Sequence, residues 1–365
     1  MTKLMSILLP LLLILPTLSC ERRPMYSIEE ERMEVIVKVL WKVEVYPEGV
    51  KPSGVTLYYF RNGEYYSEQT TADVDSCTVR LEPGRYRLYM ISQSPDEYGY
   101  LKFDNLTDFD KASVSVLNTD TKWYSRSEGE ELLSNPEMMT VGVSDEFEIT
   151  EDMVDRYHYT LKNSRATKGD TSDGGDPDNP DIEPIISYYT VRIPVHPKSI
   201  VSQYWITIYS DNADVLQSVR ASTTGMAKTF ELTKFKTGSE EGTQFITHWS
   251  LTIDDPITRT GHVDGKITTF GFPNGELPSP QRDSTLNVSA LLIDYKTVEN
   301  YVFNVGDKIT LEDPPEGYRS LYRLIFGSAA APAIHPPDVR PPDNASGFDA
   351  EVGDWEEGDK VDIIM

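Results

Sequence analysis

The sequence has few cysteines, few histidines and no apolar run long enough to cross a membrane. Two cysteines and five histidines occur in 365 residues, so a disulfide framework or a histidine-rich metal site is not expected. Neither a His-Glu-x-x-His motif nor a Gly-x-Ser-x-Gly elbow is present. A glycosidase-type pair of carboxylates stays open, but most acidic residues fall in turns or on polar strand faces. An enzyme is therefore the least favoured class, and no cofactor is expected.

Basic residues are scarce relative to acidic ones. The chain has 34 Lys and Arg against 59 Asp and Glu, which gives a formal net charge of −25. A body this acidic repels the phosphate backbone, so nucleic acid is not expected as a partner. An anionic membrane surface would not attract the body of the protein either.

The N-terminus carries a short leader. Lys3 precedes an apolar run over residues 4–15, and a small residue, Ser19, stands directly before Cys20. A charged start, a short apolar stretch and a small residue indicate a secretory signal over residues 1–19. The run is shorter than the roughly 20 residues that a membrane-spanning helix needs.

The end of this leader resembles the lipobox of bacterial lipoproteins, although Thr17 stands where that motif more often has Leu. The resemblance implies cleavage between Ser19 and Cys20 and acylation of Cys20. Two or more acyl chains give stable anchoring, so the partner would be a lipid membrane. The expected location is the outer membrane, lipid-anchored, with the body at the cell surface. An ordinary secreted protein is the alternative.

After lipidation of Cys20, Cys77 has no cysteine left to pair with. Its neighbours, Asp75-Ser76-Cys77-Thr78-Val79, are typical of a strand. A buried, small apolar side chain is therefore favoured over a reactive thiol.

The mature chain has the pattern of a β protein. Apolar residues alternate without interruption over residues 33–45, which predicts a strand. Asn62-Gly63 and Pro83-Gly84 predict tight turns between strands. Further strands are expected after residue 185, at 188–195, 204–209, 227–232, 245–253, 266–270, 286–293 and 301–305, and a short helix at 128–133. Short strands separated by turns predict an all-β fold of antiparallel sandwiches.

Periodicity is lost over residues 163–184, which are rich in Gly, Asp and Pro. This composition favours an acidic linker over a calcium site, because no EF-hand loop fits it. The predicted organisation is a signal at 1–19, a tether at 20–32, a β-sandwich at 33–162, the linker at 163–184, and a second β-sandwich at 185–365.

The C-terminus ends in a row of alternating apolar residues, Val361, Ile363 and Met365. They predict a terminal strand that either closes the second sandwich or is exchanged with another subunit. A proline-rich stretch at residues 330–342 precedes it.

Several motifs resemble the fimbrillin-like lipoproteins of Bacteroidales, a superfamily of pilus subunits and anchors. They lie in this order along the chain: residues 35–41, 53–60, 81–86 with Pro83-Gly84, 222–227, 269–273, and 347–350 followed by Asp354-Trp355. The resemblance implies two tandem transthyretin-like β-sandwich domains and, as possible partners, other pilus subunits.

The resemblance leaves the function open. One hypothesis is a structural or anchor component of adhesive pili, in which a strand of one subunit completes another. The other is a surface lipoprotein that binds glycan or host protein without polymerising. Tyrosine pairs such as Tyr58-Tyr59 and Tyr65-Tyr66 would suit a binding face, although cross-strand packing is the favoured interpretation.

Overall fold

The structure is a computed structural model that describes residues 31–42, 51–121, 130–169, 189–278, 284–306 and 308–342. Strands predominate, and in this part of the chain α2 (Glu151–Gly169) is the one α-helix. The predicted all-β fold class is confirmed. The chain forms two compact units. The first contains the N-terminal stretch, residues 51–93 and residues 142–197. The second contains residues 94–141 and the chain from Lys198 onward.

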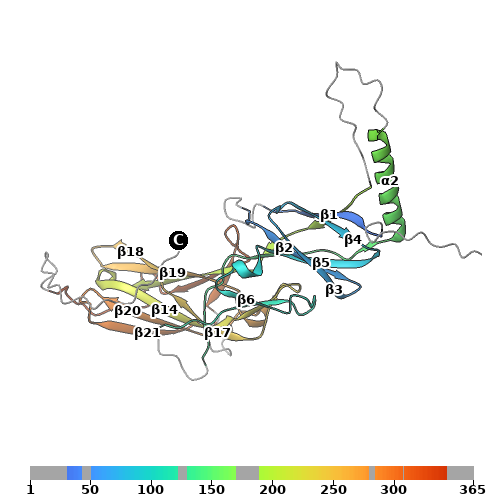
Figure 1. The fold of residues 1–365 in the computed structure, drawn as a ribbon. Helices are drawn as coiled ribbons and strands as arrows, with labels where there is room; N and C mark the ends of the chain where they lie inside the picture. The colour runs from blue at the N-terminus through green and yellow to red at the C-terminus, as the bar shows by residue number, and fades with distance from the viewer. Residues whose placement is uncertain are drawn as a thin grey trace, which may run out of the picture. The chain divides into compact units, whose positions relative to one another are not determined.

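The first unit is built from two facing sheets (Figure 1). One has the strand order β11-β1-β4, and the other contains β9-β5-β2-β3, with β10 also paired to β5. Asn62 and Gly63 join β2 to β3 with φ of 53° and 88°, as a two-residue hairpin turn requires. The strands are β1 (Met33–Val39), β2 (Val55–Arg61), β3 (Glu64–Thr71), β4 (Ser76–Leu81), β5 (Gly84–Ser92), β9 (Thr140–Val143), β10 (Phe147–Ile149) and β11 (Val191–Val195).

The core of this unit follows the alternation that the sequence shows. Met33, Val35, Val37 and Val39 are buried, and the residues between them are partly exposed. They pack with apolar residues of β2, β4 and β5. The strand predicted over residues 33–45 thus ends at Val39, where Leu40 N donates to Val195 O at 2.8 Å, and residues 43–50 lie outside the described residues.

Helix α2 was not predicted, and it occupies the start of the expected linker. Thr150 precedes it, and Thr150 Oγ1 accepts a hydrogen bond from Met153 N at 3.3 Å, as an N-cap residue does. Glu151 and Asp152 occupy the first turn, where negative charge is favourable. Val154 and Tyr157 are buried in the core of the first unit.

The second unit contains two larger sheets and a smaller one (Figure 1). The two larger sheets have the orders β18-β19-β13-β23-β22 and β21-β20-β14-β17-β8, and the smaller one is β16-β15-β7-β6. Most pairs are antiparallel, but β23 runs parallel to β13 and β8 runs parallel to β17.

The strands of this unit come from both parts of the chain. They are β6 (Leu101–Asp104), β7 (Ser113–Val116), β8 (Leu132–Leu133), β12 (Lys198–Ser199), β13 (Ser202–Ser210), β14 (Leu216–Ala227), β15 (Thr229–Glu231), β16 (Lys236–Thr237), β17 (Glu241–Ile246), β18 (Trp249–Asp255), β19 (Thr260–Thr269), β20 (Thr285–Leu292), β21 (Val298–Asn304), β22 (Ile309–Glu312) and β23 (Leu321–Phe326). The helix predicted at 128–133 is wrong at its described C-terminal end, because Leu132 and Leu133 form β8 beside β17.

A partly buried arginine, Arg319, makes several contacts in the second unit. Arg319 Nη2 donates to Phe270 O at 2.5 Å, and its guanidinium carbon lies 5.0 Å from the centre of the Phe230 ring. Burial lowers the pKa of Arg319 below its usual value, while the Tyr322 hydroxyl opposes that shift. Arg319 also donates from its backbone N–H to Val201 O at 2.7 Å, so it fixes the chain that enters β23 beside the start of β13.

The division into units differs from the predicted boundaries in two stretches. Residues 94–141, expected in the first sandwich, group with the second unit, where β7 pairs with β15. Residues 189–197, expected in the second sandwich, group with the first unit because β11 pairs in parallel with β1. Local periodicity cannot reveal such pairings, since the partner strands are far apart in sequence.

Candidate functional site

The residues predicted to act at the two chain ends lie outside the described residues. These are Ser19 and Cys20 at the leader, and Val361, Ile363 and Met365 at the C-terminus. Their proposed lipidation, cleavage and strand exchange stay predictions.

The tyrosine pairs predicted from the sequence take part in aromatic packing. Tyr59 is fully buried, and Tyr58 stacks on Tyr89 with ring centres 4.9 Å apart. Tyr66 makes an edge contact with Tyr86 at 5.7 Å. The cross-strand packing interpretation accounts for these side chains without a ligand.

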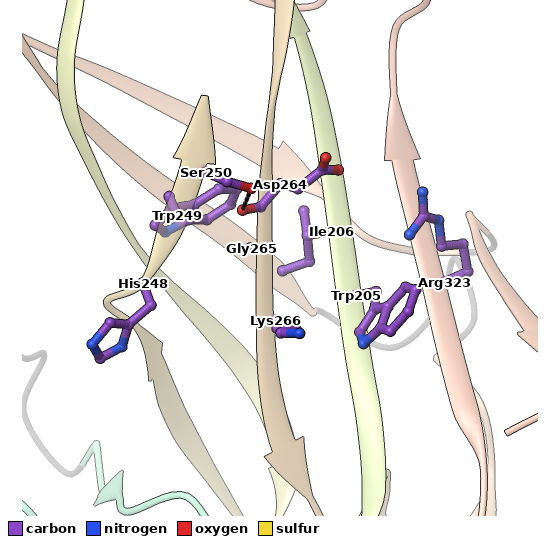
Figure 2. A pocket seen from close by; sticks show the side chains of 9 residues that line it. All are labelled: Trp205, Ile206, His248, Trp249, Ser250, Asp264, Gly265, Lys266 and Arg323. Atoms are coloured by element: carbon purple, nitrogen blue, oxygen red, sulfur yellow. Dashed lines mark hydrogen bonds between the residues drawn. The ribbon is translucent and has the colours of Figure 1, made fainter. Parts of the chain in front are cut away.

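A cleft of about 630 Å³ opens on the second unit, along the sheet formed by β18, β19, β13 and β23 (Figure 2). This volume lies in the range of small-ligand sites, which is about 300–1,000 Å³. Its lining residues are Trp205, Ile206, His248, Trp249, Ser250, Asp264, Gly265, Lys266 and Arg323.

Three side chains in one row across the sheet form the centre of this cleft. Trp205 of β13 is directly opposite Lys266 of β19 on one side and Arg323 of β23 on the other. Lys266 Nζ lies 5.8 Å from the centre of the Trp205 ring, and the guanidinium carbon of Arg323 lies 5.6 Å from it. Trp205 Nε1 donates to Gln203 Oε1 at 2.7 Å, which fixes the orientation of the indole.

The alternation of β13 and β19 directs these side chains outward. Tyr204, Ile206 and Ile208 are buried in the core, and Trp205 between them is partly exposed. On β19, Val263 and Ile267 are buried, whereas Lys266 is exposed. The period of two that builds the core therefore also builds the cleft.

A polar network borders the row of Trp205, Lys266 and Arg323. Arg323 Nη2 lies 3.1 Å from Thr207 Oγ1, and the Thr207 hydroxyl donates to Asp264. Asp264 also lies 3.3 Å from His262 Nε2, and the other ring nitrogen of His262 lies 2.9 Å from Asp254. This network holds Asp264 beside the indole with its side chain still 40% exposed.

A close approach on the core side of the sheet explains a glycine in the cleft. A Cβ at Gly265 would lie 2.8 Å from Trp249 Cε2 and 2.8 Å from Ile246 Cγ2. The indole of Trp249 packs there against the core, and its Nε1 donates to Ile246 O at 3.0 Å. Glycine at 265 therefore lets Trp249 fix the edge strand β18 against β19.

The cleft offers binding chemistry: a partly exposed indole, two cations, a carboxylate and the hydroxyl of Ser250. Among the described residues, no group of three or more His, Cys, Asp or Glu is placed to hold a metal ion. No helix in the described part is long and apolar enough to span a membrane.

The strand predicted at 204–209 includes Trp205, so the sequence could place this residue on a strand. Because β23 was not predicted, the sequence could not place Arg323 beside it.

Comparison with known proteins assigns the chain to a family. The family described as "Domain of unknown function (DUF5119)" matches residues 19–247. The chain belongs to this DUF5119 family. No curated protein matches its sequence.

Solved structures share the fold of this DUF5119 chain. A candidate adhesin from Bacteroides ovatus ATCC 8483 matches with a TM-score of 0.51 and 14% identity, covering 89% of this chain and 99% of that one. The fimbrial anchor protein Mfa2 from Porphyromonas gingivalis has a TM-score of 0.42 and 11% identity, covering 80% and 90% of the respective chains. The fold assignment rests on the first of these. At 14% identity this likeness shows the fold alone.

Proposed function

We propose that this DUF5119 chain is a lipid-anchored surface protein that acts in adhesion through binding and has no catalytic role. The observation that carries the proposal is the open cleft around Trp205, which has the groups of a binding site on a rigid sheet. The lipobox-like Ser19-Cys20 supports anchoring at the outer membrane. The fold shared with a candidate adhesin agrees with a role at the cell surface.

A structural or anchor role in pili is one form of this function. β21 and β22 are edge strands of the two larger sheets among the described residues, and they expose Val302 and Leu311 by 70% and 62%. Edge strands with exposed apolar side chains can accept an added strand from another chain. Val361, Ile363 and Met365 are the candidate donor residues for such an exchange.

A non-polymerising binder of glycan or host protein is the second form. The Trp205 cleft favours it, because the indole and its flanking cations are available to a ligand without any strand exchange. The two forms are compatible if an anchored subunit also binds a ligand.

Membrane attachment tests the location. Cys20→Ala should move the protein from the membrane fraction to the soluble fraction and abolish incorporation of labelled palmitate. Cys77→Ala is the matched control and should stay in the membrane fraction. A Cys20→Ala protein that stays membrane-bound, with a wild type that takes up no label, would contradict the lipid anchor.

Adhesion and assembly test the role. Cells that display the wild type should adhere to host-cell glycoprotein more strongly than cells that lack it, and Cys20→Ala should remove the difference. The purified chain run on a sizing column separates the two forms, since ladders or fibres indicate a pilus component and a sharp monomer indicates a binder. Equal adhesion with and without the protein, together with a monomer, would overturn the proposed function.

A further inference from the structure

The two cations of the Trp205 cleft differ from the cations of this unit that form ion pairs. Arg259 contacts Asp214 at 2.8 Å and Asp338 at 2.9 Å, and Lys228 contacts Glu131 at 2.5 Å. In contrast, neither Lys266 nor Arg323 has a carboxylate oxygen within 4.0 Å in the described part of the chain. Both cations contact the Trp205 ring, and Arg323 also contacts the Thr207 hydroxyl.

The positive charge of the cleft is not neutralised by an ion pair with a neighbouring carboxylate among the described residues. With 59 acidic and 34 basic residues, a cation has many carboxylates available to pair with. Two cations that flank one indole and pair with none of them leave a local positive site on an acidic protein. His248, which also lines the cleft, adds a further nitrogen-bearing side chain at the same end (Figure 2).

We infer that the Trp205 cleft binds a carboxylated sugar at the end of a glycan. The apolar C–H face of a sugar ring packs against an indole, and Trp205 is held in place for this by Gln203. The sugar carboxylate would lie against Arg323, since a guanidinium binds carboxylate through paired hydrogen bonds, and Lys266 on the other side of the indole would add to the attraction. Asp264 and Ser250 are placed to accept and donate hydrogen bonds with the sugar hydroxyls. This inference deepens the proposed function and rests on it.

The charge of the whole molecule selects against larger anions. A polyanion such as nucleic acid would bring many charges close to a chain of net charge −25. A single terminal carboxylate meets the local field of two cations, Lys266 and Arg323, and of one lining carboxylate, Asp264, because charges farther away than about 10 Å are screened at ordinary salt. The cleft therefore suits one charged sugar better than a charged polymer.

The test is a binding measurement with the full mature chain bearing Cys20→Ala. The probes are 3′-sialyllactose, a disaccharide that ends in glucuronic acid, and neutral lactose. At least one acidic probe should bind about tenfold or more tightly than lactose, with a change in tryptophan fluorescence that Trp205→Phe reduces. Binding should weaken at about 0.5 M salt, because it depends on charge.

Variants locate the binding in the cleft. Arg323→Met and Lys266→Met should each weaken the acidic probe about tenfold and leave lactose unchanged, while Trp205→Ala should weaken both probes. Lys296→Met, which removes an exposed lysine from the turn between β20 and β21, is the matched control and should bind as the wild type does. Thermal unfolding of each variant checks that it is folded.

Other outcomes overturn the inference. Equal binding of lactose and the acidic probes, binding that Arg323→Met and Lys266→Met leave unchanged, or equal binding of a glutamate-rich peptide would each refute a carboxylated-sugar site. Adhesion that persists when no acidic probe binds would refute this inference alone and leave the proposed function standing. Loss of membrane attachment and adhesion in the wild type would instead refute the proposed function.

Discussion

The Sγ atom of Cys77 lies 3.9 Å from the hydroxyl oxygen of Tyr59 in the core of the first unit. Cys77 is on β4 opposite Val37 of β1, and Tyr59 is on β2 in the facing sheet. Burial raises the pKa of the Cys77 thiol, and only the Tyr59 hydroxyl lowers it in part. The predicted small apolar role of Cys77 fits this environment, because a thiol that stays protonated is a poor nucleophile.

We therefore expect Cys77 to resist thiol reagents in the native protein. In the Cys20→Ala chain it is the one remaining cysteine, so labelling reports on it alone. Reaction with a maleimide at neutral pH should be roughly a hundredfold slower in the folded state than in urea, since it requires opening of the core. Complete labelling of the folded protein within the time needed in urea would show that the thiol is accessible.

A buried charge in β1 should unfold the first unit. Val37 is fully buried, whereas the side chain of Lys38 next to it is partly exposed. Val37→Asp should lower the free energy of unfolding by about 3 kcal/mol or more, because a buried carboxylate without a partner is strongly destabilising. Lys38→Asp places the same residue on the other face and should cost about 1 kcal/mol or less. Urea unfolding of both variants measures the difference, and equal stability of the two would show that this face is not core.

The extent of that strand illustrates what sequence alone could predict. The alternation over residues 33–39 reflects a local period, so it gave the correct strand and the correct buried face. The same alternation continues in the sequence to Val45, yet β1 ends at Val39. Pairing with β4 reaches only Lys38 and pairing with β11 reaches Val39, and these partners decide where the strand ends.

A carboxylate links the ends of three strands in the first unit. Glu82, between β4 and β5, contacts Arg32 Nη2 at 2.7 Å and Arg61 Nη1 at 2.6 Å. The hydrogen bond from Arg32 is the main cause that holds the pKa of Glu82 below its usual value, and Arg61 adds to it. Because the Glu82 side chain is 26% exposed, water weakens this interaction.

We expect Glu82→Gln to cost about 1 kcal/mol or less at neutral pH. A carboxyl group with a lowered pKa in the folded state stabilises the protein above its unfolded pKa, which is about 4.3 for Glu. The advantage of the wild type over Glu82→Gln should therefore be complete at neutral pH and decline as the pH falls below about 4. Urea unfolding of both proteins across this range measures it. A difference that stays constant down to acid pH, or that grows there, would contradict the assignment.

The candidate binding site was beyond the reach of sequence reasoning for a physical reason. Lys266, Trp205 and Arg323 meet only because β13 pairs with β19 on one side and with β23 on the other. The parallel pair joins residues more than a hundred positions apart, as with Trp205 and Arg323. Periodicity predicts which face a residue occupies, but it carries no information on which strand lies beside it.

The partly buried Arg319 should be more important to the second unit than an exposed arginine. Arg319→Ala removes the donor to Phe270 O and the cation over Phe230, and it leaves a buried carbonyl without that bond. We expect a loss of about 2–3 kcal/mol in the free energy of unfolding. Arg319→Lys should recover only part of it, because an ammonium group lacks the planar fork of the guanidinium. Arg340→Ala, at an exposed arginine that follows β23, is the control. Equal effects of Arg319→Ala and Arg340→Ala would show that the contacts of Arg319 contribute nothing.

The interleaving of the two units predicts the outcome of cutting the chain between them. The composition of residues 163–184 predicts a site of proteolysis, and α2 extends to Gly169, so we expect a cut after that residue. Two separately folding domains would then come apart. The strand pairings instead predict that the two fragments stay together after the cut. The C-terminal fragment carries β11, which pairs with β1 and buries Val195 in the first unit, while the N-terminal fragment carries β7 and β8, which pair with β15 and β17 of the second.

A specific protease site inserted after Asp176 would fix the position of the cut. After cleavage, the two fragments should separate on a denaturing gel but elute together at the size of the intact chain on a native sizing column. Ile193→Asp, which places a charge in the strand beside β1, should weaken this association, whereas Arg192→Asp on the opposite face should weaken it much less. Fragments that separate without denaturant and remain folded would show that each sandwich is complete within its own stretch of sequence. The arrangement in which each half of the chain contributes strands to the other unit would then be wrong.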